Sequence, residues 1–141
     1  MFTNIKAVLF DLDGTLIDSA PDLGAAVDRM RVKRGMPSLP LDIYRPMAGA
    51  GARGMLGVGF GITPQDAAFA ELKEEFFQEY EANLTDKTTV FAEVVEMLSA
   101  IEARGMVWGV VTNKAERFTL PISRQMALFK NAACVVCGDT T

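Results

Sequence analysis

A short apolar run that ends at two acidic residues constrains the fold of this chain more than any other feature. Lys6–Phe10 is rich in β-prone apolar residues, and the segment Asp11-Leu12-Asp13-Gly14-Thr15 follows it directly. An apolar run of this length is typical of a strand that is buried on both faces, as in a parallel sheet. Ligands of open α/β sheets bind at the carboxyl ends of the strands. The pattern therefore predicts an α/β fold with Asp11 and Asp13 at its functional edge.

Two later apolar runs continue this pattern. Val107–Val111 follows a helical pattern that begins near Phe91. A third short strand is expected at about 133–137, after a helix that begins near Ala115. Alternating strands and helices favour a parallel sheet with right-handed crossovers. The sequence therefore predicts three parallel strands with helices between them.

The region between the first two strands differs, because it shows only helical patterns. A helix is predicted over 21–34, and a second long helix over about 63–84, with an aromatic face that packs against the first. Residues 36–62 are rich in proline and glycine and are expected to hold at most short helices. The expected division of the chain is a helical insert over 18–86 and a sheet domain over 1–17 and 87–141.

Composition excludes several classes of function. The net charge is −4, so the chain lacks the basic surface that grips nucleic acid or an anionic membrane. Its apolar runs are too short to span a bilayer, and its first residues lack the pattern of a secretory signal. A cytoplasmic protein is therefore expected. The chain has no histidine, which excludes Ser-His and Cys-His catalysis and most zinc sites.

Two short motifs are better explained by structure than by chemistry. The segment 49–54 matches G-x-G-x-x-G, but Pro46 lies just before it, where the dinucleotide fingerprint requires a strand. Cys134 and Cys137 form a C-x-x-C spacing inside an apolar run. That context favours a buried strand over a redox or metal site.

Asp11 and Asp13 lie two residues apart at a strand exit, so an extended backbone would point both carboxylates the same way. Two facing carboxylates repel each other, and Mg²⁺ is a cation that such oxygen ligands bind. A solvated turn is the alternative, because aspartate and glycine are common turn residues. Thr112 and Asn113 end the second long apolar run, and parallel strands would place them at the same edge.

The string 11–18, Asp-Leu-Asp-Gly-Thr-Leu-Ile-Asp, resembles the first motif of the haloacid dehalogenase-like (HAD) superfamily, D-x-D-G-T-L. The resemblance implies that Asp11 is a nucleophile, that Asp13 is a general acid and base, and that both take part in a Mg²⁺ site. It also implies that Thr112 and Asn113 hold a phosphoryl group. The implied fold is a HAD-like, Rossmann-like parallel sheet with an inserted all-helical C1 cap, in which the cap closes over the site.

The segments Phe10–Pro21 and Trp108–Leu120 are similar to the phosphoglycolate phosphatase group and to its relatives acting on N-acetylmuramic acid 6-phosphate. This narrower resemblance implies a phosphatase that acts on a small phosphorylated metabolite, with 2-phosphoglycolate as the first choice. Arg53 is a candidate for binding a substrate carboxylate, because arginine pairs bidentately with carboxylates. A surface role is its alternative, and Lys114 is expected to be a solvated charge.

One departure from the family pattern stands out. The superfamily's third motif is a lysine and its fourth supplies further acidic residues, and neither Lys114 nor Lys130 lies at the family position. The sequence is therefore expected to be the amino-terminal part of a longer enzyme, with a truncated sheet. The expected alternatives are an inactive fragment, an assembly partner or a phosphoacceptor signalling domain. A homodimer is expected as well, because a truncated sheet leaves an unpaired edge.

Overall fold

The computed structural model describes residues 6–139 and divides the chain into two compact units. The sheet unit is formed by the two ends of the chain, up to Asp18 and from Thr89 onward. The helical unit spans 19–88. The range expected from sequence for the helical insert was 18–86. In the described part of the chain, no helix combines the length and the apolar character needed to cross a bilayer.

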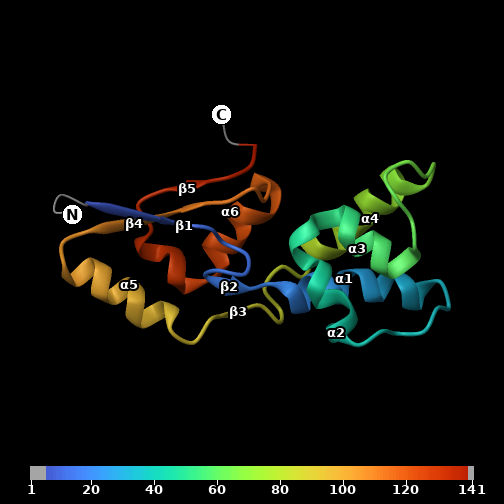
Figure 1. Ribbon diagram of the computed structural model, residues 1–141, viewed down its shortest axis with the longest axis horizontal. Helices are drawn as coiled ribbons and strands as arrows, with labels where there is room; N and C mark the ends of the chain where they lie inside the picture. The colour runs from blue at the N-terminus through green and yellow to red at the C-terminus, as the bar shows by residue number, and fades with distance from the viewer. Residues whose placement is uncertain (1–5, 140–141) are drawn as a thin grey trace. The chain divides into compact units, whose positions relative to one another are not determined.

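The sheet unit is built on three parallel strands, β1 (Ala7–Phe10), β4 (Val107–Val111) and β5 (Val135–Val136), in the order β1-β4-β5 (Figure 1). Phe10 pairs with Val110 in the register. The predicted α/β fold with a parallel sheet is thus confirmed. The two-residue strands β2 (Ile17–Asp18) and β3 (Thr89–Val90), which the sequence did not indicate, form a separate antiparallel pair.

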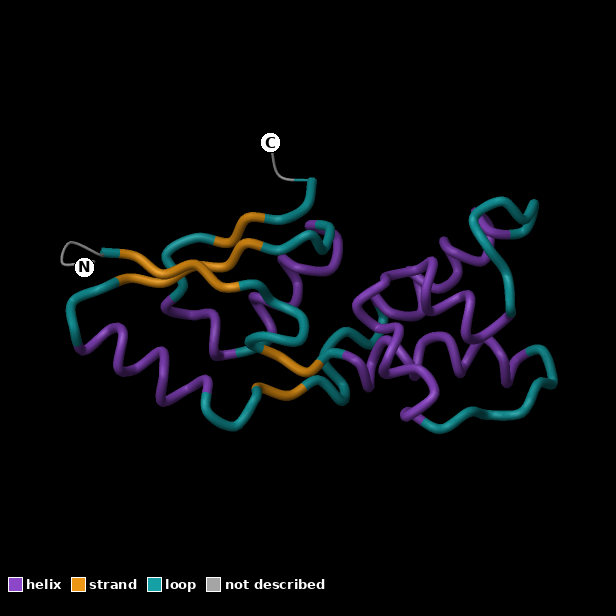
Figure 2. The backbone as a smooth tube through the Cα atoms, viewed as in Figure 1, coloured by secondary structure: helices purple, strands orange, loops and turns teal. Residues whose placement is uncertain are grey.

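Helices of the sheet unit cover one face of the sheet. They are α5 (Val94–Ala103), α6 (Glu116–Gln125) and the 3₁₀ helix η2 (Ala127–Asn131) (Figure 2). Trp108 and Val110 of the central strand are buried on this face. The indole Nε1 of Trp108 donates a hydrogen bond of 2.9 Å to Glu102 of α5. The core of this unit therefore lies between the sheet and these helices.

The opposite face of the sheet is open, which corrects the expectation that the first two strands are buried on both faces. Leu9 is 59% exposed, Val107 is 51% exposed and Val111 is 43% exposed. Side chains alternate between the two faces of a strand. Among the described residues of the sheet unit, helices cover only the face that carries Trp108 and Val110, and the alternate residues Val107 and Val111 point to the other face.

The helical unit contains α1 (Ala20–Lys33), α2 (Leu41–Tyr44), the 3₁₀ helix η1 (Arg45–Ala50), α3 (Gly51–Phe60) and α4 (Phe69–Glu81). Its core combines one apolar face of α1 with the aromatic face of α4, as predicted. The buried side chains on these two faces are Leu23, Val27, Met30, Phe76 and Tyr80.

Two elements of this unit differ from the prediction. The glycine-rich segment forms the ten-residue helix α3, because its glycines allow close packing: a Cβ on Gly59 would lie 2.3 Å from Val27 of α1. Helix α4 begins at Phe69 rather than at Thr63. The Asp66 carboxylate accepts a hydrogen bond of 2.6 Å from the Thr63 N–H, which closes a turn before the helix.

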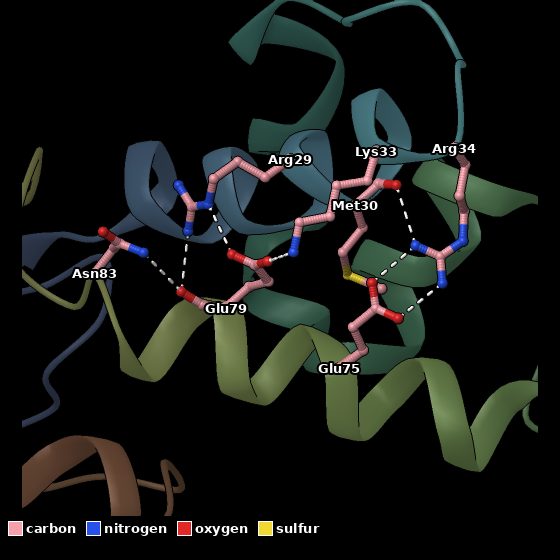
Figure 3. A network of polar contacts seen from close by, with 7 residues as sticks. All are labelled: Arg29, Met30, Lys33, Arg34, Glu75, Glu79 and Asn83. Carbon is pink, nitrogen blue, oxygen red and sulfur yellow. Dashed lines mark hydrogen bonds and ion pairs between the residues drawn. The ribbon is translucent and has the colours of Figure 1, made fainter.

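Ion pairs join α1 to α4 along the exposed rim of the helical unit (Figure 3). Arg29 donates a hydrogen bond of 2.9 Å to the Glu79 carboxylate, and Lys33 pairs with the same group. Arg34 forms a bidentate pair with Glu75 at 2.7 and 2.8 Å. These basic partners hold the pKa of both glutamates below the usual value.

A buried aspartate ties together the two segments at which the helical unit begins and ends. The Asp22 carboxylate, at the start of α1, accepts hydrogen bonds from the Lys87 N–H at 2.9 and 3.1 Å. It also accepts a bond of 2.6 Å from the Thr88 hydroxyl. The Asp22 side chain therefore links the first helix of the helical unit to the last residues of that unit.

Candidate active site

The turn after β1 presents two aspartates on either side of a buried leucine. Leu12 is buried, whereas Asp11 is exposed and Asp13 is half-buried, so both carboxylates point away from the core. The Asp11 Oδ1 atom accepts a hydrogen bond of 2.7 Å from the Leu12 N–H. Gly14 has a φ of 77°, and its N–H bonds the Ile17 carbonyl at 2.9 Å. A glycine suits this left-handed position, which fixes the turn.

The turn after β4 is held by three hydrogen bonds that all involve Lys114. The buried Thr112 hydroxyl accepts a bond of 3.1 Å from the Lys114 N–H. The Lys114 carbonyl accepts a bond of 2.9 Å from Gly138, just beyond β5, and one of 3.3 Å from the Thr119 hydroxyl of α6. The turn is thus anchored to its own strand, to the next strand and to the next helix.

These two turns meet through an ion pair between Lys114 and Asp13. The Lys114 Nζ atom lies 3.1 Å from each Asp13 carboxylate oxygen, and its side chain is only 9% exposed. Burial lowers the pKa of Lys114, and the Asp13 charge opposes that shift. The expectation that Lys114 is a solvated charge was wrong. Its partner lies 101 positions earlier, a separation that no local sequence pattern reports.

The residues predicted for the site fall into two groups. Asp11, Asp13, Thr112 and Asn113 follow the carboxyl ends of the paired strands β1 and β4, as the parallel register requires. Arg53 belongs to the helical unit, where it is exposed in the first turn of α3 rather than in a loop.

The two cysteines of the C-x-x-C motif flank the short strand β5. Strand β5 covers only Val135–Val136, with Cys134 exposed and Cys137 buried. The acidic residue that follows, Asp139, accepts a hydrogen bond of 2.8 Å from the Glu116 N–H at the start of α6. Neither feature adds a ligand to the two aspartates after β1.

Of the two aspartate carboxylates after β1, one is available to a divalent cation and the other is paired with a lysine. Asp11 offers an exposed carboxylate at the strand end, which is the kind of ligand that Mg²⁺ prefers. Both oxygens of Asp13 contact the Lys114 ammonium group. A cation on the Asp13 side chain would therefore have to replace that ammonium group. Residues 6–139 hold no cluster of three acidic, cysteine or histidine side chains arranged around one point.

Comparison with known proteins places this geometry in a family. The chain is 45% identical over 136 residues to a phosphoglycolate phosphatase of Xanthomonas campestris, and 38% identical over 135 residues to an N-acetylmuramic acid 6-phosphate phosphatase of Pseudomonas putida. Each alignment covers 96% of this chain, but the chain spans only 61% and 60% of these curated relatives.

Solved structures and a family model agree with these relatives. A protein from Haemophilus somnus, described as a predicted phosphoglycolate phosphatase, superposes with a TM-score of 0.79 at 25% identity, covering 100% of this chain and 66% of that one. A solved structure of a protein from Clostridium difficile gives a TM-score of 0.81 at 20% identity, which shows the fold alone. The family model for haloacid dehalogenase-like hydrolases matches residues 8–141. The chain belongs to the haloacid dehalogenase-like hydrolase family.

Proposed function

We propose that the protein hydrolyses phosphate monoesters of small metabolites through an aspartyl-phosphate on Asp11. The observation that carries the proposal is the pair of aspartates held outside the core at the carboxyl end of β1, next to the turn that ends β4. Two relatives named as phosphatases, 45% and 38% identical, support it. Because the chain spans about 60% of their length, the activity of the whole protein remains part of the proposal.

In the proposed reaction, an Asp11 carboxylate oxygen attacks phosphorus and the bond to the ester oxygen breaks. Asp13 gives a proton to the departing alkoxide, so an alcohol leaves. Asp13 then takes a proton from water, whose oxygen attacks phosphorus. The bond to Asp11 breaks and inorganic phosphate is released. The Thr112 hydroxyl and Asn113 would hold the phosphoryl oxygens where negative charge increases.

Magnesium is typical of the phosphatases in this family. We propose that the Asp11 carboxylate and the Asp13 backbone carbonyl would hold it. The Asp13 side chain, which the sequence also suggested as a ligand, is paired with Lys114 in the structure. When bound, the ion would offset repulsion between the carboxylate and the dianionic phosphate. Neither Lys114 nor Lys130 lies at the family position of the third-motif lysine, so this chain alone is expected to hydrolyse phosphoglycolate poorly or not at all.

The proposed substrate is 2-phosphoglycolate, with N-acetylmuramic acid 6-phosphate as the alternative. 2-Phosphoglycolate is preferred because the relative named as a phosphoglycolate phosphatase has the higher sequence identity to this chain, 45% against 38%. Arg53 would then bind the substrate carboxylate.

The cytoplasm is the proposed location, because small phosphorylated metabolites are formed and used there. Neither nucleic acid nor a membrane is a proposed partner.

The test is hydrolysis of both substrates with and without Mg²⁺, in the native protein and in Asp11→Asn. Asp11→Asn is expected to abolish turnover, because an amide is a poor nucleophile. Chelation of the metal should have a similar effect. Asp42→Asn, which removes the same charge from an exposed position in α2, serves as the control and should leave turnover unchanged. Retained turnover in Asp11→Asn would exclude the proposed nucleophile.

A further inference from the structure

We propose that Lys114 is a positioning residue, whose ammonium group holds the Asp13 carboxylate in the direction from which it accepts a proton from water. The inference rests on the proposed function, because Asp13 acts there as acid and base. The inference concerns Lys114, which was expected from the sequence to be a solvated charge. The contact joins the turn after β4 to the turn after β1.

The geometry of the pair restricts the carboxylate. The ammonium group lies 3.1 Å from both Asp13 oxygens, so the carboxylate can neither tilt nor rotate without losing one contact. The lysine side chain is 9% exposed and the aspartate side chain is 31% exposed. Solvent therefore reaches the aspartate rather than the lysine. With about a third of its side chain exposed, Asp13 is accessible to a water molecule from solvent.

The backbone that carries Lys114 is itself fixed. Its N–H bonds the Thr112 hydroxyl, and its carbonyl accepts bonds from Gly138 and from Thr119. Gly138 approaches so closely that an added Cβ would lie 2.2 Å from the Asn113 carbonyl oxygen. A cation on such a turn is held before any substrate arrives. Preorganisation of this kind is effective because small misplacements are costly, about 10²-fold in rate for 1 Å.

Hydrolysis of the aspartyl-phosphate, the second step of the proposed reaction, can be measured separately and depends on Asp13 as a base. Acetyl phosphate can phosphorylate Asp11 without an acid, because its phosphorus–oxygen bond breaks to release acetate, a weak base. Hydrolysis of the aspartyl-phosphate still needs a base: water attacks phosphorus, its proton passes to Asp13, and the bond to Asp11 breaks. The lifetime of the phosphorylated protein therefore reports on Asp13 and on the group that orients it.

The experiment measures the decay of protein labelled with ³²P-acetyl phosphate. Lys114→Met is expected to lengthen the lifetime at least about 10-fold, since an orienting contact is lost. Lys114→Arg, which keeps the charge, should restore part of the native rate. Lys130→Met removes the same charge from an exposed position in η2 and should decay at the native rate. Thermal unfolding of each variant verifies that it is folded.

A double-variant cycle separates positioning from a general structural effect. Asp13→Asn alone should lengthen the lifetime, and adding Lys114→Met to it should change nothing further. A native lifetime in Lys114→Met, or additive effects in the double variant, would overturn the role of Lys114 while leaving the proposed function intact. Absence of any label on Asp11 in the native protein would instead overturn the proposed function.

Discussion

At the scale of single residues, the glycine after β5 controls how closely two strand ends approach. A Cβ on Gly138 would lie 2.2 Å from the Asn113 carbonyl oxygen and 2.8 Å from its carbon. Gly138→Ala should therefore push the 112–114 turn away and destabilise the fold by about 1–3 kcal/mol. Thermal unfolding followed by circular dichroism measures this. Gly49→Ala, where the added Cβ meets nothing within 4 Å, is the control, and equal melting temperatures would contradict the argument.

Residue patterns predicted the strand-end groups of the candidate site but not all of their contacts. Asp11, Asp13 and Thr112 could be placed at one edge, because parallel strands carry whatever follows them to the same side. The pairing of Lys114 with Asp13 could not be predicted, because it depends on the register of β1 against β4. The sequence shows only that Lys114 follows Thr112 by two positions.

At the scale of elements, α1 and α4 are joined by an ion-pair network centred on Glu79 (Figure 3). Glu79→Gln is expected to destabilise the helical unit by up to about 1 kcal/mol at neutral pH, since pairs near the surface contribute little. The melting temperature by circular dichroism measures this. Glu71→Gln, at an exposed position in α4, should have a smaller effect.

The contribution of Glu79 should also depend on pH with a definite sign. The hydrogen bond from Lys33 is the largest cause that holds the pKa of Glu79 below its usual value of 4.5. A depressed pKa means that the stabilisation is complete above the unfolded value and is lost as the pH falls through the folded one. The melting temperatures of the native protein and Glu79→Gln should therefore converge in acid. A difference that persists well below pH 4.5 would show that charge is not its source.

Elements with a strong hydrophobic period could be predicted from sequence, and elements that depend on contacts could not. The strand Val107–Val111 and the helix α1 follow their own patterns to within a residue or two. Helix α3 contains glycines that disfavour helices in isolation. It forms in this protein because Gly59 lets it pack closely against Val27 of α1, a tertiary contact that helix propensity does not take into account.

At the scale of the whole molecule, the sheet unit presents an apolar face to water. The exposed side chains on this face come from all three strands and are Leu9, Val107, Val111 and Val136. The registers of β1 with β4 and of β4 with β5 place them on one side of the sheet. Contiguous apolar surface of this kind favours association. We therefore expect copies of this chain to self-associate through this face, in line with the homodimer expected from sequence.

Sedimentation velocity over a range of concentrations tests this expectation. Val107→Lys places a charge in the middle of the apolar face and should shift the population toward monomers, because burying that charge in an interface is costly. Val32→Lys is a matched control, because Val32 is 55% exposed and Val107 is 51% exposed, and Val32 lies on α1 in the other unit. If the two lysine variants associate equally, the sheet face is not the contact. If the native chain stays monomeric at every concentration, the apolar face remains exposed to solvent and the homodimer is excluded.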